Sequence, residues 1–147
     1  AAAAFSRIAA AGTPFVSRGD SSGTHLRELE IWRQAGSVGG EPWYIEAGQG
    51  MAASLMIALE KQAYILTDRG TYLAFRERTD LQILLEGDPA LLNPYHIMTV
   101  VPGRFSKVHA AAAKAFAEFL VSPRTQAAIA SFGRDRFGMP LFFADAH

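Results

Sequence analysis

Cysteine is absent from this chain of 147 residues, and long apolar runs are absent as well. Without cysteine the chain forms no disulfide bonds and no thiolate metal sites. Its longest apolar stretch falls well short of the ~20 residues that a helix needs to cross a bilayer. Neither sign of charge is in excess, because 14 basic residues balance 14 acidic ones. No basic run or basic stripe with aromatics occurs, so we expect no nucleic-acid partner.

From the sequence we expect neither a zinc site nor a signal peptide. The four histidines lie far apart, and no pair of them has the spacing of a zinc site: His25, His96, His109 and His147. The alanine-rich start has neither the basic segment nor the apolar core of a signal peptide, and it lacks an initiator Met. We therefore expect either a cytosolic protein or, more in keeping with the missing Met, a mature or truncated chain.

Helix-like and strand-like segments alternate along the sequence, which predicts an α/β fold with a mostly parallel sheet flanked by helices. Helices are expected over residues 1–11, 24–35, 51–62, 69–75, 108–121 and 123–132. Strands are expected over residues 15–17, 43–45, 63–66, 81–85 and 96–101. The helix over 24–35 is indicated by Leu26, Leu29 and Trp32, which are spaced by three. The tail over 137–147 is expected to be irregular.

The turn over residues 17–25, with the sequence SRGDSSGTH, is the most informative segment. It joins an expected strand to an expected helix, so the free N–H groups and positive dipole end of that helix face an anion. Arg18 adds charge, Ser22 and Thr24 add hydroxyl and backbone donors, and Gly23 permits close approach. Asp20 would repel an anion directly and is expected to pair with Arg18. An ordinary N-capped helix explains the same spacing equally well.

Two further helix starts could contribute to the same site. Gly50 and Met51 follow a Gly-rich turn and could supply backbone N–H donors, although a plain loop-to-helix junction also fits. Arg69 stands at the start of a third helix and could reach the anion or pair with a nearby carboxylate. Asp68 is expected to cap that helix.

The segment over 19–23 also looks like the Gly-Asp-Ser-Gly-Gly sequence around the nucleophile of chymotrypsin-like proteases. Those enzymes are all-β and place a general-base histidine and a buried aspartate far upstream in the chain. Here no histidine precedes the motif, and we expect no enzymatic activity.

Taken together, these motifs resemble one family, the tungstate-binding proteins that serve ABC importers. The segments that carry the resemblance lie at 17–25 (SRGDSSGTH), 48–51 (GQGM), 63–73 (AYILTDRGTYL), 93–95 (NPY) and 138–142 (GMPLF). Members are type II periplasmic binding proteins, with two α/β lobes around an anion cleft. Phosphate-binding relatives carry a similar turn, Arg-x-Asp-x-Ser-Gly-Thr, but lack the 63–73 segment in this form.

The resemblance implies a fold and a division of the chain. It implies a three-layer α/β lobe with added C-terminal helices, covering roughly the C-terminal half of a binding protein. Residues 1–11 would be a remnant helix, 12–92 the second lobe with the anion-binding turn, and 93–147 a segment returning to a first lobe. The Thr- and Ser-rich turn with which that lobe supplies the opposite wall of the cleft is not in this sequence.

The resemblance also implies a function without a cofactor. Tungstate or molybdate would be the ligand, held by Arg18, Ser22, Gly23 and Thr24, with Gly50 and Met51 as further donors and Asp20 and Arg69 in support. The partners would be an ABC transporter permease and, over the helix face of Phe116, Phe119 and Leu120, a second copy or a complementing first lobe. The expected location is the periplasm. Two alternatives stay open, namely a phosphate- or sulfate-binding lobe and the oxyanion-sensing domain of a regulator.

Overall fold

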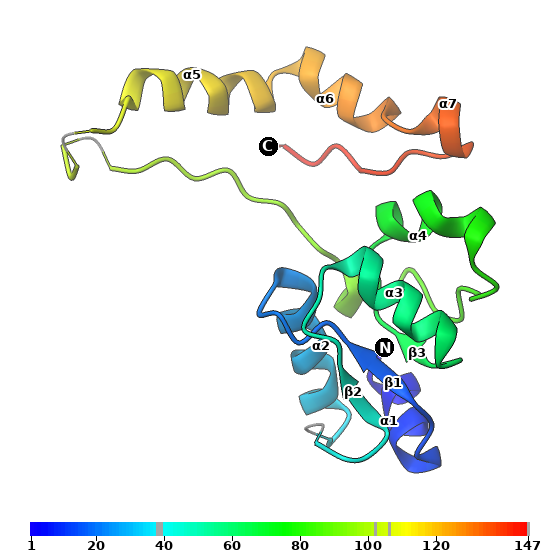
Figure 1. Cartoon of the computed structure of the whole chain (residues 1–147). Helices are drawn as coiled ribbons and strands as arrows, with labels where there is room; N and C mark the ends of the chain where they lie inside the picture. The colour runs from blue at the N-terminus through cyan, green and yellow to red at the C-terminus, as the bar shows by residue number, and fades with distance from the viewer. Residues whose placement is uncertain (38–39, 102, 106, 147) are drawn as a thin grey trace. The chain divides into compact units, whose positions relative to one another are not determined.

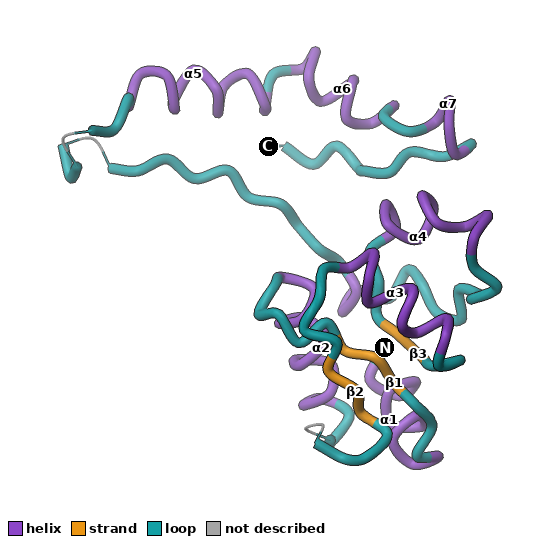
Figure 2. Tube along the Cα trace, viewed as in Figure 1, coloured by secondary structure: helices purple, strands orange, loops and turns teal. Residues whose placement is uncertain are grey.

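The computed structural model describes residues 1–37, 40–101, 103–105 and 107–146, and it separates into two compact units, Ala1–Asn93 and Pro94–His147. Figure 1 and Figure 2 show the order of the elements along the chain. In the first unit they are α1 (Ala2–Ala11), β1 (Phe15–Ser17), α2 (Gly23–Gln34), β2 (Tyr44–Glu46), α3 (Met51–Glu60), β3 (Tyr64–Ile65), α4 (Arg69–Phe75) and the 3₁₀ turns η1 (Arg76–Arg78) and η2 (Pro89–Leu91). In the second they are α5 (Ala110–Val121), α6 (Pro123–Ser131) and α7 (Arg134–Phe137).

The sheet of the first unit is parallel, as predicted, and β1 is its central strand. The strand order is β2-β1-β3, with Phe15 aligned to Tyr44 on one side and to Tyr64 on the other. Both connections between strands pass through a helix, α2 and then α3, as parallel pairing requires. All three strands therefore end at the same edge of the sheet.

Helices cover both faces of this sheet, because successive side chains of a strand point to opposite sides. Phe15 packs with Phe5 of α1 and with Ile31 and Trp32 of α2, and the rings of Phe5 and Trp32 lie 4.5 Å apart. Val16 points the other way and packs with Ala58 of α3. The predicted three-layer α/β arrangement is therefore present in the first unit.

The predicted helices all form, and polar caps explain where three of them begin, with Ser22 as the cap of α2. Asp68 caps α4 and Ser122 caps α6, with Pro123 at the first helical position. The tail prediction needs one correction. Residues 134–137 form the short helix α7 between two left-handed glycines, Gly133 and Gly138, so Phe137 is the end of a helix.

Two predicted strands are wrong. Residues 81–85 and 96–101 adopt no strand pairing, although both are rich in apolar side chains. A strand exists only when a neighbouring segment takes up its N–H and C=O groups. The described part of the chain offers these two segments no such neighbour.

The second unit lacks buried side chains among its described residues. Large apolar side chains stand exposed along it, including Phe116 and Phe119 of α5 at 59% and 57%, which confirms the predicted exposed face. Leu120, the third residue of that face, is half-buried. Within the described residues, no helix has the length and apolar character needed to span a bilayer.

Candidate functional site

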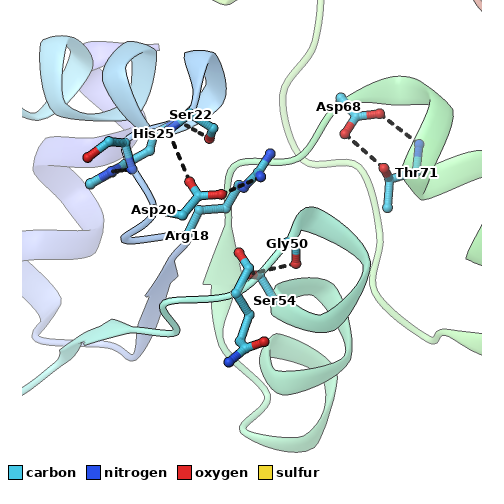
Figure 3. Close-up of polar contacts among 10 residues, drawn as sticks. Arg18, Asp20, Ser22, His25, Gly50, Ser54, Asp68 and Thr71 are labelled. Carbon is cyan, nitrogen blue, oxygen red and sulfur yellow. Dashed lines mark hydrogen bonds and ion pairs between the residues drawn. The ribbon is translucent and has the colours of Figure 1, made fainter.

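Three helices begin at the edge of the sheet where the strands end. Residues 18–22 lead from β1 into α2, residues 47–50 lead from β2 into α3, and residues 66–68 lead from β3 into α4. Parallel α/β sheets bind ligands at this edge, outside the carboxyl ends of the strands. Figure 3 draws polar side chains from all three helix starts.

Arg18 and Asp20 form an ion pair within the first turn, as predicted. The second oxygen of Asp20 accepts the backbone N–H of Ser22 at 3.1 Å. Hydrogen bonds from Ser22, and then from Arg18, lower the pKa of Asp20 to about 2. Both carboxylate oxygens of Asp20 are therefore occupied, while the Arg18 Nε is buried without a hydrogen-bond partner. The guanidinium keeps donor capacity for a ligand.

The start of α2 leaves two backbone donors for a ligand. Ser22 is the N-cap, and its side-chain oxygen accepts the backbone N–H of His25 at 3.3 Å. The N–H groups of Gly23 and Thr24 precede that bonded group in the first turn of the helix. Gly23 is exposed and Thr24 is half-buried, so neither backbone is sealed off from solvent.

The start of α3 lies against the first turn. The N–H of Gln49 donates to the carbonyl of Arg18 at 3.3 Å, which ties the two turns together. Gly19 sits at this junction with φ +62°, and a Cβ there would lie 3.1 Å from the Cβ of Glu46. No side chain caps α3 at its N-cap residue Gly50, whereas side chains cap α2 and α4. Met51 buries its side chain, so only its backbone could face a ligand.

Asp68 caps the start of α4. Asp68 accepts the backbone N–H of Thr71 and also its hydroxyl, both at 2.8 Å. The guanidinium of Arg69 lies 3.6 Å from the carboxylate of Glu86. Arg69 is therefore directed toward a neighbouring carboxylate, and its supporting role in the site stays a prediction.

The buried face of α2 includes only one of the three residues whose spacing indicated the helix. Leu26 and Leu29 are exposed, and the residues that face the sheet are His25, Glu28, Ile31 and Trp32. The apolar spacing did not identify this face, because two polar side chains occupy it. Their spacing of three, continued by Ile31, is the signal that could have revealed it.

Glu28 is held in the core by a tyrosine of the neighbouring strand. Its side chain is 1% exposed and accepts the Tyr44 hydroxyl at 2.8 Å. Burial raises the pKa of Glu28, and the hydrogen bond from Tyr44 acts in the opposite direction. Burial likewise raises the pKa of Tyr44, so its hydroxyl stays a donor.

His25 is committed to the backbone. Its Nδ1 accepts the N–H of Ser21 at 3.0 Å, so this nitrogen is not free to take a proton from a serine hydroxyl. The arrangement around Ser21 and Ser22 is thus a set of donors fixed by neighbouring acceptors. The described residues contain no cluster of acidic or histidine side chains suited to hold a metal ion.

Comparison with known proteins shows the superfamily of the chain. A family model described as a PBP superfamily domain matches residues 1–124. The chain belongs to this superfamily. It is 41% identical over 132 residues to a tungstate-binding protein, TupA, of Peptoclostridium acidaminophilum, covering 90% of this chain and 46% of that protein. The chain thus spans about half the length of the curated relatives that it matches.

Solved structures of this superfamily share the fold. The tungstate-binding protein TupA of Desulfovibrio alaskensis G20 superimposes with a TM-score of 0.78 at 39% identity, over 99% of this chain and 60% of that one. The tungstate ABC transporter structure from Geobacter sulfurreducens gives a TM-score of 0.74 at 46% identity, over 84% of this chain and 53% of that one. The PBP-type α/β fold predicted from the motifs is therefore confirmed.

Proposed function

We propose that this chain supplies one wall of an oxyanion site in the substrate-binding protein of an ABC importer, with tungstate or molybdate as ligand. The observation that carries the proposal is the donor set at the edge of the sheet. Arg18, the first N–H groups of α2 and the N–H groups of α3, which no side chain caps, lie on two turns joined by a hydrogen bond. The names of the relatives supply the ligand class.

The state of Asp20 favours an unprotonated anion over phosphate. Phosphate keeps a proton near neutral pH and gains from an acceptor in its site, whereas tungstate and molybdate need donors only. The one carboxylate of the turn already accepts from Arg18 and from the Ser22 N–H. Tungstate and molybdate have nearly the same size and charge, so the donors proposed here serve both.

The role in transport is binding without chemistry. We infer a periplasmic location and delivery of the anion to a transporter permease, in keeping with relatives named for tungstate binding and for a tungstate ABC transporter. No catalytic step is needed, because the donors hold the anion by charge and hydrogen bonds alone.

The second unit supports a protein partner. Exposed aromatic side chains on α5, with the rings of Phe116 and Phe119 stacked at 6.5 Å, form an apolar surface of the kind that drives association. We propose that a second copy or a complementing first lobe covers this surface. Light scattering tests the first possibility, and a monomer at high concentration would exclude the homodimer.

Chemical-shift titration of the ¹⁵N-labelled chain tests the ligand, because it registers weak binding at single amides. Tungstate and molybdate should move the amides of Gly23, Thr24 and Met51, and Arg18→Ala should weaken binding roughly tenfold to a hundredfold. Arg33→Ala is the matched control, since Arg33 lies on the same helix with its side chain 73% exposed. Stronger shifts with phosphate or sulfate than with tungstate would overturn the ligand assignment.

A further inference from the structure

We propose that His25 is a positioning residue, whose Nδ1 holds Ser21 in a left-handed backbone conformation and thereby builds the anion-binding turn before any ligand arrives. The inference rests on the proposed function where it concerns affinity. The hydrogen bond from the Ser21 N–H to His25 Nδ1, which we call the lock, is a property of the unliganded chain. Figure 3 shows His25 and Ser22 together at the start of α2, beside Asp20 and Arg18.

Ser21 is in a conformation that its own side chain disfavours. Its φ is +58°, and among the described residues only Ser21 and Gln62 combine a positive φ with a side chain. The left-handed region crowds the Cβ against the backbone, and outside glycine it persists only where surrounding contacts enforce it. A serine at this position therefore needs a contact that stabilises the left-handed conformation.

The imidazole of His25 provides that contact. Its Nδ1 accepts the Ser21 N–H at 3.0 Å, and His25 is 8% exposed, so the acceptor side of the bond is shielded from water. Because Nδ1 accepts, it carries no proton, and a ring proton lies on Nε2. The ring is fixed in turn by α2, since the His25 backbone N–H is capped by Ser22.

The lock decides which donors remain for a ligand. The N–H of Ser21 goes to His25, and the N–H of Ser22 goes to Asp20, the residue that pairs with Arg18. Both N–H groups that precede α2 therefore already have acceptors within the turn. The next N–H groups, those of Gly23 and Thr24, are left for an anion in an orientation set by Ser21.

Two substitutions of His25 discriminate between its ring nitrogens, because the side-chain amides of Asn and Gln reach different nitrogen positions of the imidazole. Asn places its side-chain oxygen close to the position of Nδ1, whereas Gln reaches the position of Nε2. We expect His25→Ala and His25→Gln to weaken tungstate binding about five- to tenfold, the value of one hydrogen bond. His25→Asn should stay within about threefold of the unmodified chain. Thermal unfolding of each variant separates loss of fold from loss of affinity.

A second substitution addresses the backbone directly. Ser21→Gly removes the Cβ that opposes a positive φ, so it should recover most of the affinity that His25→Ala loses. On its own, Ser21→Gly should change tungstate affinity by less than about threefold. Equal losses in His25→Asn and His25→Ala at matched unfolding temperatures, or no recovery with Ser21→Gly, would overturn the proposal.

A ligand-free measurement keeps this inference separate from the proposed function. In the unliganded chain, ¹⁵N NMR should show a coupling across the hydrogen bond between the Ser21 amide and Nδ1, and ring ¹⁵N shifts with the proton on Nε2. Coupling without any tungstate response would support the lock and overturn the proposed ligand. Absence of the coupling, or a proton on Nδ1, would overturn the lock whatever the chain binds.

Discussion

The hydrogen bond between Tyr44 and the buried Glu28 gives a prediction of stability that the structure quantifies. Tyr44→Phe removes the hydroxyl that donates to Glu28 at 2.8 Å and keeps the ring that stacks on Phe15 at 6.1 Å. Glu28 is 1% exposed, so water does not replace the lost donor. Hydrogen bonds to charged groups contribute about 1.5–3 kcal/mol. We therefore expect the free energy of unfolding to fall by about 2 kcal/mol where Glu28 is ionised.

The cost of this substitution should grow with pH. The pKa of Glu28 is raised by burial and lowered by the Tyr44 hydrogen bond, so losing the bond raises it further above the ordinary 4.5. A raised pKa means that the folded state binds the proton more tightly, and stability is then greatest below the unfolded value and falls as pH rises through the folded one. Below the pH at which Glu28 ionises, the hydrogen bond joins a neutral tyrosine and a neutral glutamic acid. Its loss should then lower the free energy of unfolding by only about 1 kcal/mol.

Urea unfolding followed by tryptophan fluorescence, from about pH 4 to pH 8, measures this cost. Both tryptophans of the chain, Trp32 and Trp43, pack in the aromatic core of the first unit, so the signal reports that unit alone. Glu28→Gln is the matched control, since it keeps an acceptor but cannot titrate. A cost of Tyr44→Phe that is the same at every pH, or that still varies with pH beside Glu28→Gln, would refute the reasoning.

Two further predictions concern the anion-binding turn. Gly19→Ala should lower the free energy of unfolding by about 1–2 kcal/mol, because the residue has a positive φ. The loss should exceed that of Gly36→Ala, because the new Cβ would lie 3.1 Å from the Cβ of Glu46, whereas nothing lies within 4 Å at Gly36. Urea unfolding measures both losses, and equal losses would contradict the account of Gly19. The pKa of Asp20, lowered to about 2 from 3.8, means that its pairing with Arg18 is complete above the ordinary value and is lost as pH falls toward 2. Asp20→Asn should therefore weaken tungstate-induced shifts at Arg18 by the same factor from about pH 5 to 8; a factor that changes across that range would count against the ion pair.

Where the helices begin could be predicted in part from local chemistry. Ser22, Asp68 and Ser122 each cap the helix that follows them, and the sequence places each cap just ahead of a helix-forming segment. The pairing of Asp20 with Arg18 was predictable for a similar reason, since opposite charges two residues apart in a turn can meet. Short-range interactions of this kind are present in the sequence itself.

The errors arose where the outcome depends on distant parts of the chain. Residues 96–101 have the composition of a strand, but pairing is a property of two segments, and the described residues hold no second one. The buried face of α2 includes Glu28 because Tyr44, on another element, brings a hydroxyl to it. The hydrogen bond from the Ser21 N–H to His25 depends on the positive φ of Ser21, which no residue type in the turn predicts.

The absence of buried side chains among the described residues of the second unit has a consequence for how a protease would cut the chain. Proteases cleave backbone that opens easily, and backbone opens easily where few side chains are buried. The buried side chains of the described residues all lie between Phe5 and Leu73, so cleavage should begin beyond Asn93 and leave a resistant fragment near the first 93 residues. That fragment would carry Arg18 and all three helix starts, which makes the proposed oxyanion wall separable from the apolar surface for which we propose a partner.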